Sequence, residues 1–345
     1  MMNDIKDLIS ALTRPVTVSG HESSAENVIE EIRSLYFDKL EYDNADNYRL
    51  IKLAKSENAK KILIDVHMDE VGMLVSDILD GGFLRVINVG GIDCKILQPC
   101  EVTVHGKEEI YGIVTATPPH LKTKDTPPSF DDLYVDTGYT KEELEEKGVR
   151  IGSAISFKYH LTQLCNNRLC GKGFDDKICI CAATDAVKQL KDCDCEIILQ
   201  LSSREEIGKC AASGAYNASP DYAIVLDVTG AAIPEEKYSV YTSSVMGQGP
   251  EISLSVLTDA SLTKKLIECA DKNSIPYQLT VDGTNTGTNA NDIPTVGTGI
   301  KTVLFSIPLM NMHTYAEIIS LDDVSYTSSL LCHFIKELAE TEAER

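Results

Sequence analysis

Four short apolar runs place the strongest constraint on how this chain can fold. They are KILIDV (61–66), EIILQLSS (196–203), DYAIVLDV (221–228) and KTVLFSIPL (301–309). Apolar runs of this length are typical of strands that are buried on both faces of a sheet. Helical patterns lie between them, at 178–191 and 259–273. Strands that alternate with helices predict an α/β sheet with helices on its faces.

The stretch from about residue 70 to 164 has a different pattern. Short strand-like pieces recur between turn residues, as in GGFLRVINVGG (81–91) and GSAISFKYH (152–160). One clear helical run appears, TKEELEEKG, in which Thr140 is a suitable cap and Gly148 a suitable stop. We therefore predict a small β-rich domain at 70–164, inserted into an α/β catalytic domain formed by 1–69 and 165–345.

Charge and composition exclude several classes of partner. The chain has 53 acidic and 32 basic residues, a net charge of −21, and no Lys/Arg cluster of the kind that a nucleic-acid binder needs. No apolar stretch reaches the about 18 residues of a membrane span, and the N-terminal residues lack the pattern of a signal peptide. The eleven cysteines are an odd number without CxxC pairs, which indicates reduced thiols and a cytoplasmic location.

Each of the four apolar runs contains near its end, or is followed by, residue types that bind metal ions. These residues are His67 and Asp69, the pair Glu205 and Glu206, Asp227, and His313. In open α/β sheets ligands bind beyond the carboxyl ends of the strands, so these side chains can converge although they are far apart in sequence. A further candidate is Asp175, which lies in GKGFDDK (171–177) just before a helical pattern.

Each candidate also has a purely structural interpretation. His67 can be a buried histidine satisfied by Asp69, and an adjacent Glu-Glu pair is usually a solvated face. Asp227 can end a strand, and His313 can be a surface residue. The order in which all of them follow strand-like runs is what favours a common site.

The combination of residue types suits a pair of metal ions. Histidine with carboxylate fits Zn²⁺ or Co²⁺, and also Mn²⁺. Two ions about 4 Å apart need one bridging carboxylate and further ligands on each side. The five side chains that meet this requirement are His67, Asp175, Glu206, Asp227 and His313. Asp69 then orients the ring of His67, and Glu205 is left as the general base.

These motifs carry a family resemblance. HMDEVG, GKGFDDK, REEIG, LDVTG and HTYAE, in this order, resemble the deblocking, glutamyl-type aminopeptidases that form tetrahedral particles, a family of dinuclear metallopeptidases. VSGHES (18–23), the 133–157 stretch and MGQGPEI (246–252) extend the similarity through nearly the whole chain. The resemblance implies an enzyme that hydrolyses the N-terminal peptide bond of short peptides.

The resemblance also implies a fold and an assembly. It implies a zinc-peptidase-like mixed sheet flanked by helices, with the β-rich, barrel-like insert as the dimerisation domain. Relatives assemble dimers into dodecamers, so a homo-oligomer is expected. The side-chain preference and the substrate-binding residues are not identified by it.

Carried over residue by residue, the resemblance assigns roles. His67 and Asp227 hold one ion, Glu206 and His313 hold the other, and Asp175 bridges the two. Glu205 matches the general base, and Asp69 the residue behind the first histidine. The bond between Asp175 and Asp176 matches one that relatives hold in cis.

Two alternatives remain open. The first is a related dinuclear deacylase or carboxypeptidase, although in the deacylases the bridging Asp follows HxD by a few tens of residues, whereas 108 positions separate His67 from Asp175. The second is a non-catalytic homologue that acts as a scaffold. Some relatives are labelled endoglucanases, but two histidines among carboxylates do not suit a metal-free glycosidase pair.

The chain departs from the family pattern at Asp176, Lys177, Arg204, Asn289 and Tyr315. It also departs in PLMNM (308–312), just before His313, where relatives commonly carry an Arg-Tyr pair. None of these departures removes a proposed ligand or the proposed base, and we expect several of them to lie around the substrate.

Overall fold

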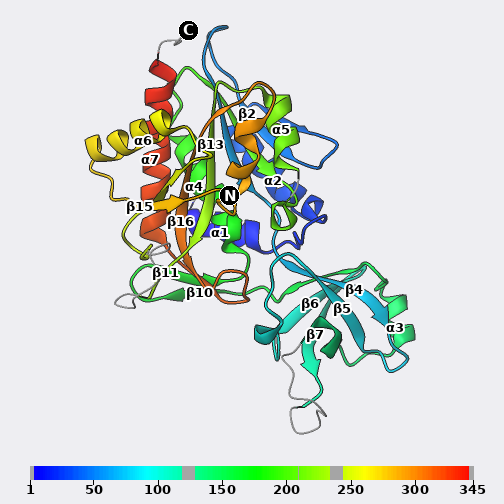
Figure 1. Ribbon diagram of the computed structural model, residues 1–345. Coiled ribbons are helices and arrows are strands. Elements are labelled where there is room, and N and C mark those ends of the chain that lie inside the picture. Colours follow the sequence, from blue (N-terminus) through cyan, green and yellow to red (C-terminus); the bar gives the residue numbers. More distant parts are fainter. Residues whose placement is uncertain (1–3, 119–128, 209, 234–243, 342–345) are drawn as a thin grey trace.

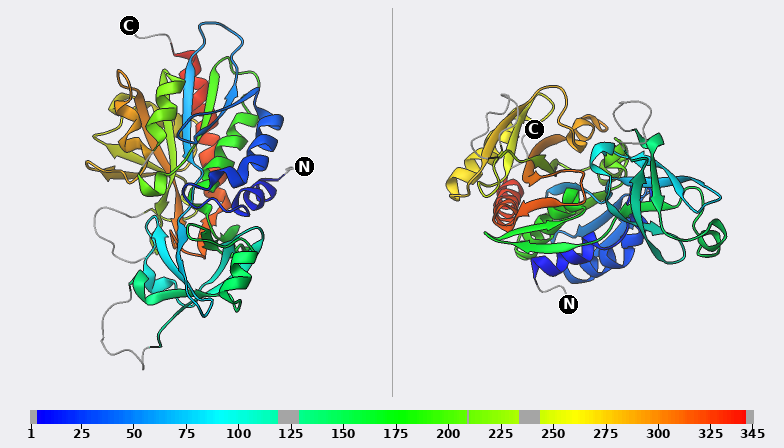
Figure 2. Two further views of the ribbon diagram at one scale, coloured as in Figure 1. Left: turned by 90° about the vertical axis from the view of Figure 1, so that its right-hand side faces the viewer. Right: turned by 90° about the horizontal axis from the view of Figure 1, so that it is seen from below.

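The computed structural model describes residues 4–118, 129–208, 210–233 and 244–341. Two bodies make up the molecule (Figures 1 and 2): a large sheet flanked by helices, and a smaller barrel beside one end of it. The predicted fold class, a mixed α/β sheet with an inserted β-rich barrel, is confirmed.

The large sheet contains eleven strands of mixed direction. Its main path runs in the order β1-β2-β12-β3-β13-β16-β17-β11-β10, and β14 pairs with β15 and β16. The strands are β1 (Lys39–Tyr42), β2 (Tyr48–Lys52), β3 (Lys61–His67), β10 (Leu161–Leu164), β11 (Arg168–Gly171), β12 (Glu196–Ser202), β13 (Tyr222–Gly230), β14 (Glu251–Ser255), β15 (Gln278–Asp282), β16 (Lys301–Met310) and β17 (Glu317–Ser320).

The four predicted runs form four neighbouring strands. β12, β3, β13 and β16 lie side by side, and each adjacent pair is parallel. Their carboxyl ends therefore meet at one edge of the sheet. Burial on both faces is confirmed in β3, where Ile62 and Ile64 pack into one hydrophobic core and Leu63, between them, packs into another. The alternation follows from the two-residue period of a strand.

Helices cover both faces of the sheet. The larger core lies under α1, α2, α4, α6 and α7, and the smaller one under α5. The helical patterns at 178–191 and 259–273 lie largely within α4 and α6. The helices are α1 (Ile5–Thr13), α2 (Glu26–Tyr36), α4 (Phe174–Lys188), α5 (Ala211–Ala218), α6 (Ala260–Lys272) and α7 (Leu321–Glu340).

The barrel is a closed ring of six strands with its own core, in the order β4-β5-β8-β7-β6-β9. The single helix predicted in this stretch is confirmed, because Thr140 caps α3 by accepting a hydrogen bond from the Glu143 N–H at 3.3 Å, and Gly148 has a positive φ of 82° just after it. The elements are β4 (Gly72–Ile78), β5 (Leu84–Val89), β6 (Glu101–His105), β7 (Glu109–Ala116), β8 (Leu133–Asp136), α3 (Lys141–Glu146) and β9 (Ala154–Phe157).

A buried ionic cluster lies where the chain leaves the large sheet for the barrel. Glu70 lies between β3 of the sheet and β4 of the barrel, and Lys172 follows β11 of the sheet. The Lys172 Nζ lies 2.7 and 2.9 Å from the two oxygens of Glu70, and the Lys177 Nζ lies 3.4 Å from one of them. All three side chains are almost completely buried. Burial opposes ionisation of Glu70, but the two ammonium groups outweigh it and lower its pKa.

Glu70→Gln should destabilise the protein strongly. The substitution leaves two buried ammonium groups without their counter-charge, and breaking a buried ion pair typically costs about 3–5 kcal/mol. Urea denaturation measures this loss of unfolding free energy. Asp80→Asn, which breaks the exposed Lys141–Asp80 pair at 3.8 Å, is the control and should change little. Equal effects of the two substitutions would contradict a stabilising role for the cluster.

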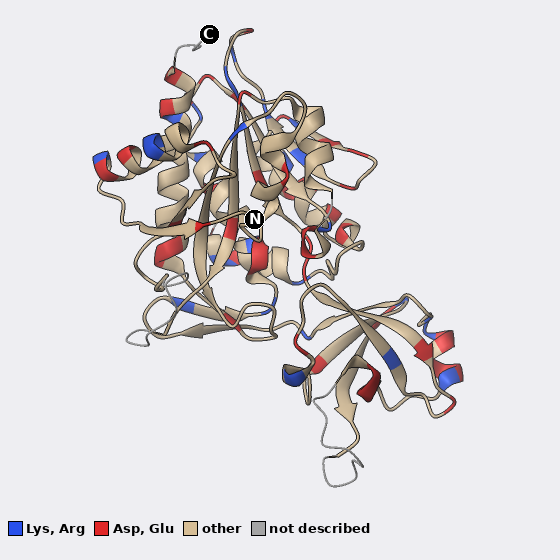
Figure 3. Ribbon diagram, viewed as in Figure 1, with Lys and Arg blue, Asp and Glu red and all other residues tan. Residues whose placement is uncertain are grey.

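Three global expectations bear on the environment of the protein. None of the eleven cysteines, all of which the structure describes, lies in a disulfide bond. Among the described residues, no helix is both long and apolar enough to cross a membrane. Figure 3 shows Lys and Arg dispersed among more numerous acidic residues.

Candidate active site

The predicted site residues converge at the carboxyl edge of the four central parallel strands. His67 is the last residue of β3 and pairs in register with Ser202, the last residue of β12. Glu205 and Glu206 follow β12 in a short 3-10 turn. Asp227 lies near the end of β13, and His313 comes three residues after β16 ends at Met310.

Asp175 lies between the two histidines. Its Oδ1 is 3.0 Å from the Nε2 of His67, and its Oδ2 is 3.3 Å from the Nε2 of His313. Burial opposes ionisation of Asp175, but hydrogen bonds from both imidazoles outweigh it and lower its pKa. One carboxylate thus offers each oxygen to a different imidazole, which is the arrangement that a carboxylate bridging two cations requires.

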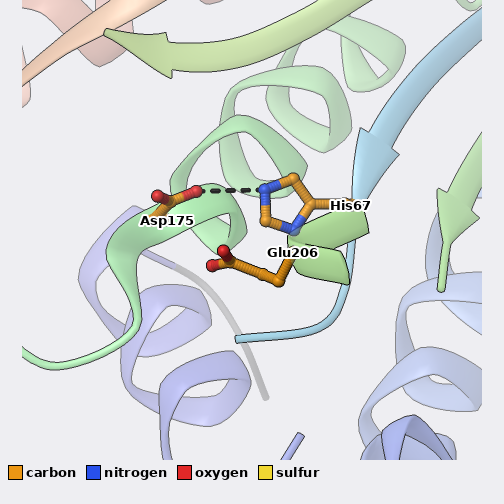
Figure 4. Close-up of side chains that lie close together, drawn as sticks. All are labelled: His67, Asp175 and Glu206. Carbon is orange, nitrogen blue, oxygen red and sulfur yellow. Dashed lines mark hydrogen bonds and ion pairs between the residues drawn. The ribbon is translucent and has the colours of Figure 1, made fainter. Parts of the chain in front are cut away.

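The other two carboxylates extend this core on opposite sides. Oδ1 of Asp227 is 3.9 Å from the Nε2 of His67, and Oε2 of Glu206 is 3.3 Å from the Nε2 of His313. Burial raises the pKa values of Asp227 and Glu206 well above normal. In Figure 4 the side chains of His67, Asp175 and Glu206 approach one another, and their ligand atoms all lie within 4.8 Å.

These side chains fit divalent cations. Ligand atoms bound tetrahedrally at about 2.1 Å lie about 3.4 Å apart, and the separations here, 3.0 to 3.9 Å, bracket that value. Oε1 of Glu206 is buried and has no hydrogen-bond partner among the described residues, so it is free to take a cation. Both histidines bind acceptors through Nδ1: His313 donates to the Gly91 carbonyl at 3.0 Å, and His67 to the Asp69 carbonyl at 3.2 Å. An ion bound here would displace the Nε2 protons that Asp175 accepts, and each ring would then bind the ion through its Nε2 lone pair.

Asp69 supports both the histidine and the Glu-Glu pair. Its Oδ1 lies 3.5 Å from the Nδ1 of His67 and accepts the Glu205 N–H at 3.0 Å, and its Oδ2 accepts the Glu206 N–H at 3.2 Å. Oε2 of Glu205 lies 4.0 Å from the Nε2 of His67. Burial raises the pKa of Glu205 to about 7.

A cavity of about 660 Å³ opens over this group. Glu205 and the five candidate ligands lie in its wall, together with residues from two further segments. These are Val228, Thr229 and Gly230 at the end of β13, and Thr286, Gly287, Thr288, Asn289, Asn291 and Asp292. The cavity can therefore bring a substrate against the candidate ligands.

Comparison with known proteins places the chain in a family. Residues 49–330 match the model of the M42 glutamyl aminopeptidases, well over half of the chain. The chain belongs to the M42 glutamyl aminopeptidase family. It is accordingly a peptidase, and the resemblance inferred from its motifs is confirmed.

Individual M42 relatives are similar over nearly their whole length. The lysyl aminopeptidase of Pyrococcus furiosus is 32% identical, with 96% of this chain and 97% of that protein covered. Among solved structures, an aminopeptidase of the archaeon Desulfurococcus kamchatkensis is 32% identical with a TM-score of 0.89, covering 96% of this chain and 94% of that one. The TET1 peptidase of Pyrococcus horikoshii, described as assembling into a tetrahedron or a large octahedral shell, is 27% identical with a TM-score of 0.81, covering 97% and 99%.

Two acidic residues of this M42 site, Glu317 and Asp176, were not predicted from the sequence to support the candidate ligands. Glu317 is buried and holds two ligand segments, because its Oε2 accepts the Phe174 N–H at 2.7 Å and its Oε1 accepts the His313 N–H at 3.0 Å. In the sequence, only its position four residues after His313, in HTYAE, could have indicated that Glu317 belongs to the site. Asp176, considered only as a departure, accepts the His67 N–H at 3.1 Å, and its bond to Asp175 is cis, as the resemblance implied.

The remaining departures from the M42 pattern fall in different places. Asn289 lines the cavity. Arg204 does not: it bonds Asp46 and the Ala45 carbonyl. Lys177 is buried beside Glu70, and the carbonyl of Tyr315 contacts His160. Asn289 therefore lies in the cavity wall, as does Met312 from the departing segment before His313, whereas Arg204, Lys177 and Tyr315 do not.

Proposed function

We propose that the chain is a dinuclear metal-dependent aminopeptidase that hydrolyses the N-terminal peptide bond of short peptides. The observation that carries the proposal is the sharing of the two Asp175 oxygens between His67 and His313. We propose His67 and Asp227 as ligands of one ion, Glu206 and His313 as ligands of the other, and Asp175 as the bridge. The donor set favours Zn²⁺ or Co²⁺, with Mn²⁺ also suitable.

When bound, the ions acidify water and polarise a carbonyl group. Glu205 then acts as the general base: its carboxylate takes a proton from the attacking water and passes it to the leaving amine. Asp69 keeps Glu205 in position by accepting its backbone N–H, and keeps the His67 ring oriented.

The proposal extends to assembly, domains and location. The tetrahedral and octahedral assemblies of the Pyrococcus horikoshii peptidase support a homo-oligomer, from dimer to dodecamer, in which the barrel forms the dimer contact.

The predicted domain division at 69/70 and 164/165 stays a prediction. The strand β10, which lies within 70–164, pairs with β11 in the large sheet. Eleven cysteines outside disulfide bonds support action in the cytoplasm.

A substrate panel tests the proposed activity. Aminoacyl p-nitroanilides should be cleaved, and N-acyl amino acids and peptides blocked at the N-terminus should not, because the proposed reaction acts on the bond next to a free amine. Dialysis against a chelator should abolish cleavage, and Zn²⁺ or Co²⁺ should restore it. Preferential hydrolysis of N-acyl amino acids would favour the deacylase alternative. Absence of any hydrolysis in the metal-loaded protein would favour a scaffold.

A further inference from the structure

One wall of the cavity, formed by residues 286–292, uses most of its side-chain hydrogen-bond donors within the protein. The Thr286 hydroxyl donates to Oδ1 of Asn291 at 2.9 Å, so the Thr288 hydroxyl, 3.0 Å from that of Thr286, must donate to Thr286. One hydrogen of the Asn291 amide in turn bonds Asn285 at 2.7 Å. Both threonine hydroxyl protons and one of the two Asn291 amide hydrogens are thus directed at side chains of the same loop.

The amide group of Asn289 also uses its hydrogen-bond donors within the protein. Its amide nitrogen donates to Oδ2 of Asp65 and to Oγ of Ser202, both at 2.8 Å. An amide NH₂ has two hydrogens, so both are used. The side chain is only 7% exposed, it lies in the cavity wall, and no described residue donates to its Oδ1. The atom that Asn289 offers to a substrate is therefore an acceptor.

Two further wall residues add acceptors. The Thr229 hydroxyl donates to Glu251 at 3.2 Å, which leaves lone pairs on its oxygen. Asp292 is exposed, and its carboxylate has no hydrogen bond or ion pair with a described residue. None of the described residues that line the cavity is Lys or Arg. Apart from the proposed metal ligands and the proposed base, Asp292 is the one charged side chain among the described residues that line the cavity.

We propose that this cavity selects peptides whose first residue carries a cationic side chain, Lys or Arg, with Asp292 as the specificity-determining residue. The proposal rests on the proposed aminopeptidase function, which brings the first side chain into the cavity. Ammonium and guanidinium groups only donate hydrogen bonds, and they match a wall of acceptors beside a carboxylate. A glutamate side chain only accepts, so it meets unpaired acceptors and a like charge.

The test compares isosteric p-nitroanilides on the zinc-loaded enzyme. Lysine is compared with norleucine, and glutamate with glutamine, by kcat/KM. The lysine to norleucine ratio should be about two- to fivefold and the glutamate to glutamine ratio below one, because an ion pair with an exposed carboxylate contributes at most about 1 kcal/mol. The lysine preference should shrink in 1 M salt, since salt screens exposed charges.

Two substitutions at the same position complete the test. Asp292→Asn should bring the lysine to norleucine ratio close to one, and Asp292→Lys should raise the glutamate to glutamine ratio. Glu57→Gln changes the net charge equally at an exposed position outside the cavity lining and should leave both ratios unchanged. Cleavage of norleucine as fast as lysine by the unmodified enzyme would overturn the selectivity while leaving the aminopeptidase proposal intact. Failure to cleave any of the four probes would overturn both.

Discussion

Glu205→Gln should lower kcat by a factor of about 10² to 10⁴ while leaving the metal content unchanged. General-base catalysis typically contributes a factor of this size. Glutamine has the shape of glutamate and keeps the backbone N–H on Asp69, but it cannot take a proton. Because Glu205 is not among the proposed ligands, elemental analysis of the variant should give the wild-type metal content.

Paired measurements separate this role from others. Turnover of an aminoacyl p-nitroanilide and metal content are measured on the same preparations, with the exposed Glu57→Gln as control. Near-wild-type turnover in Glu205→Gln would refute the assignment of the base. Loss of metal from the variant would instead make Glu205 a ligand.

Asp175→Asn should abolish activity by a different route, the loss of bound metal. Among the residues that the structure describes, Asp175 is the one carboxylate within 3.3 Å of both imidazoles, and asparagine is a neutral and much weaker ligand. We expect metal content well below that of the wild type and a loss of at least about 10³-fold in kcat/KM, because the chemistry depends on the ions.

The fold of this variant must be checked separately. Far-ultraviolet circular dichroism should remain that of the parent, and Asp192→Asn, an exposed change just after α4, serves as the matched control. Retention of full metal content and activity in Asp175→Asn would contradict the bridging role.

The parts of the site that were predictable are those encoded locally. A strand buried on both faces needs a continuous apolar run, and the residue that ends such a run lies at the edge of the sheet. His67, Glu206 and Asp227 could therefore be placed at one edge before the strand order was known. The neighbouring, parallel arrangement of the four strands then brings them together.

The parts that were not predictable depend on contacts between distant segments. Glu317 binds the backbone of Phe174 and His313, and Gly91, from the loop after β5 of the barrel, accepts the His313 Nδ1–H. An acidic residue or a glycine in a turn carries no sign of such a partner. Arg204 illustrates the converse, because its neighbour Glu205 lines the cavity while its own side chain bonds Asp46.

Elemental analysis of the purified protein, read together with peptidase activity before and after chelation, tests the central claim most directly. The account predicts close to two divalent ions per chain, loss of amino-acid release when they are stripped, and recovery when Zn²⁺ or Co²⁺ is returned. Peptidase activity that survives in protein containing far less than one ion per chain would contradict it.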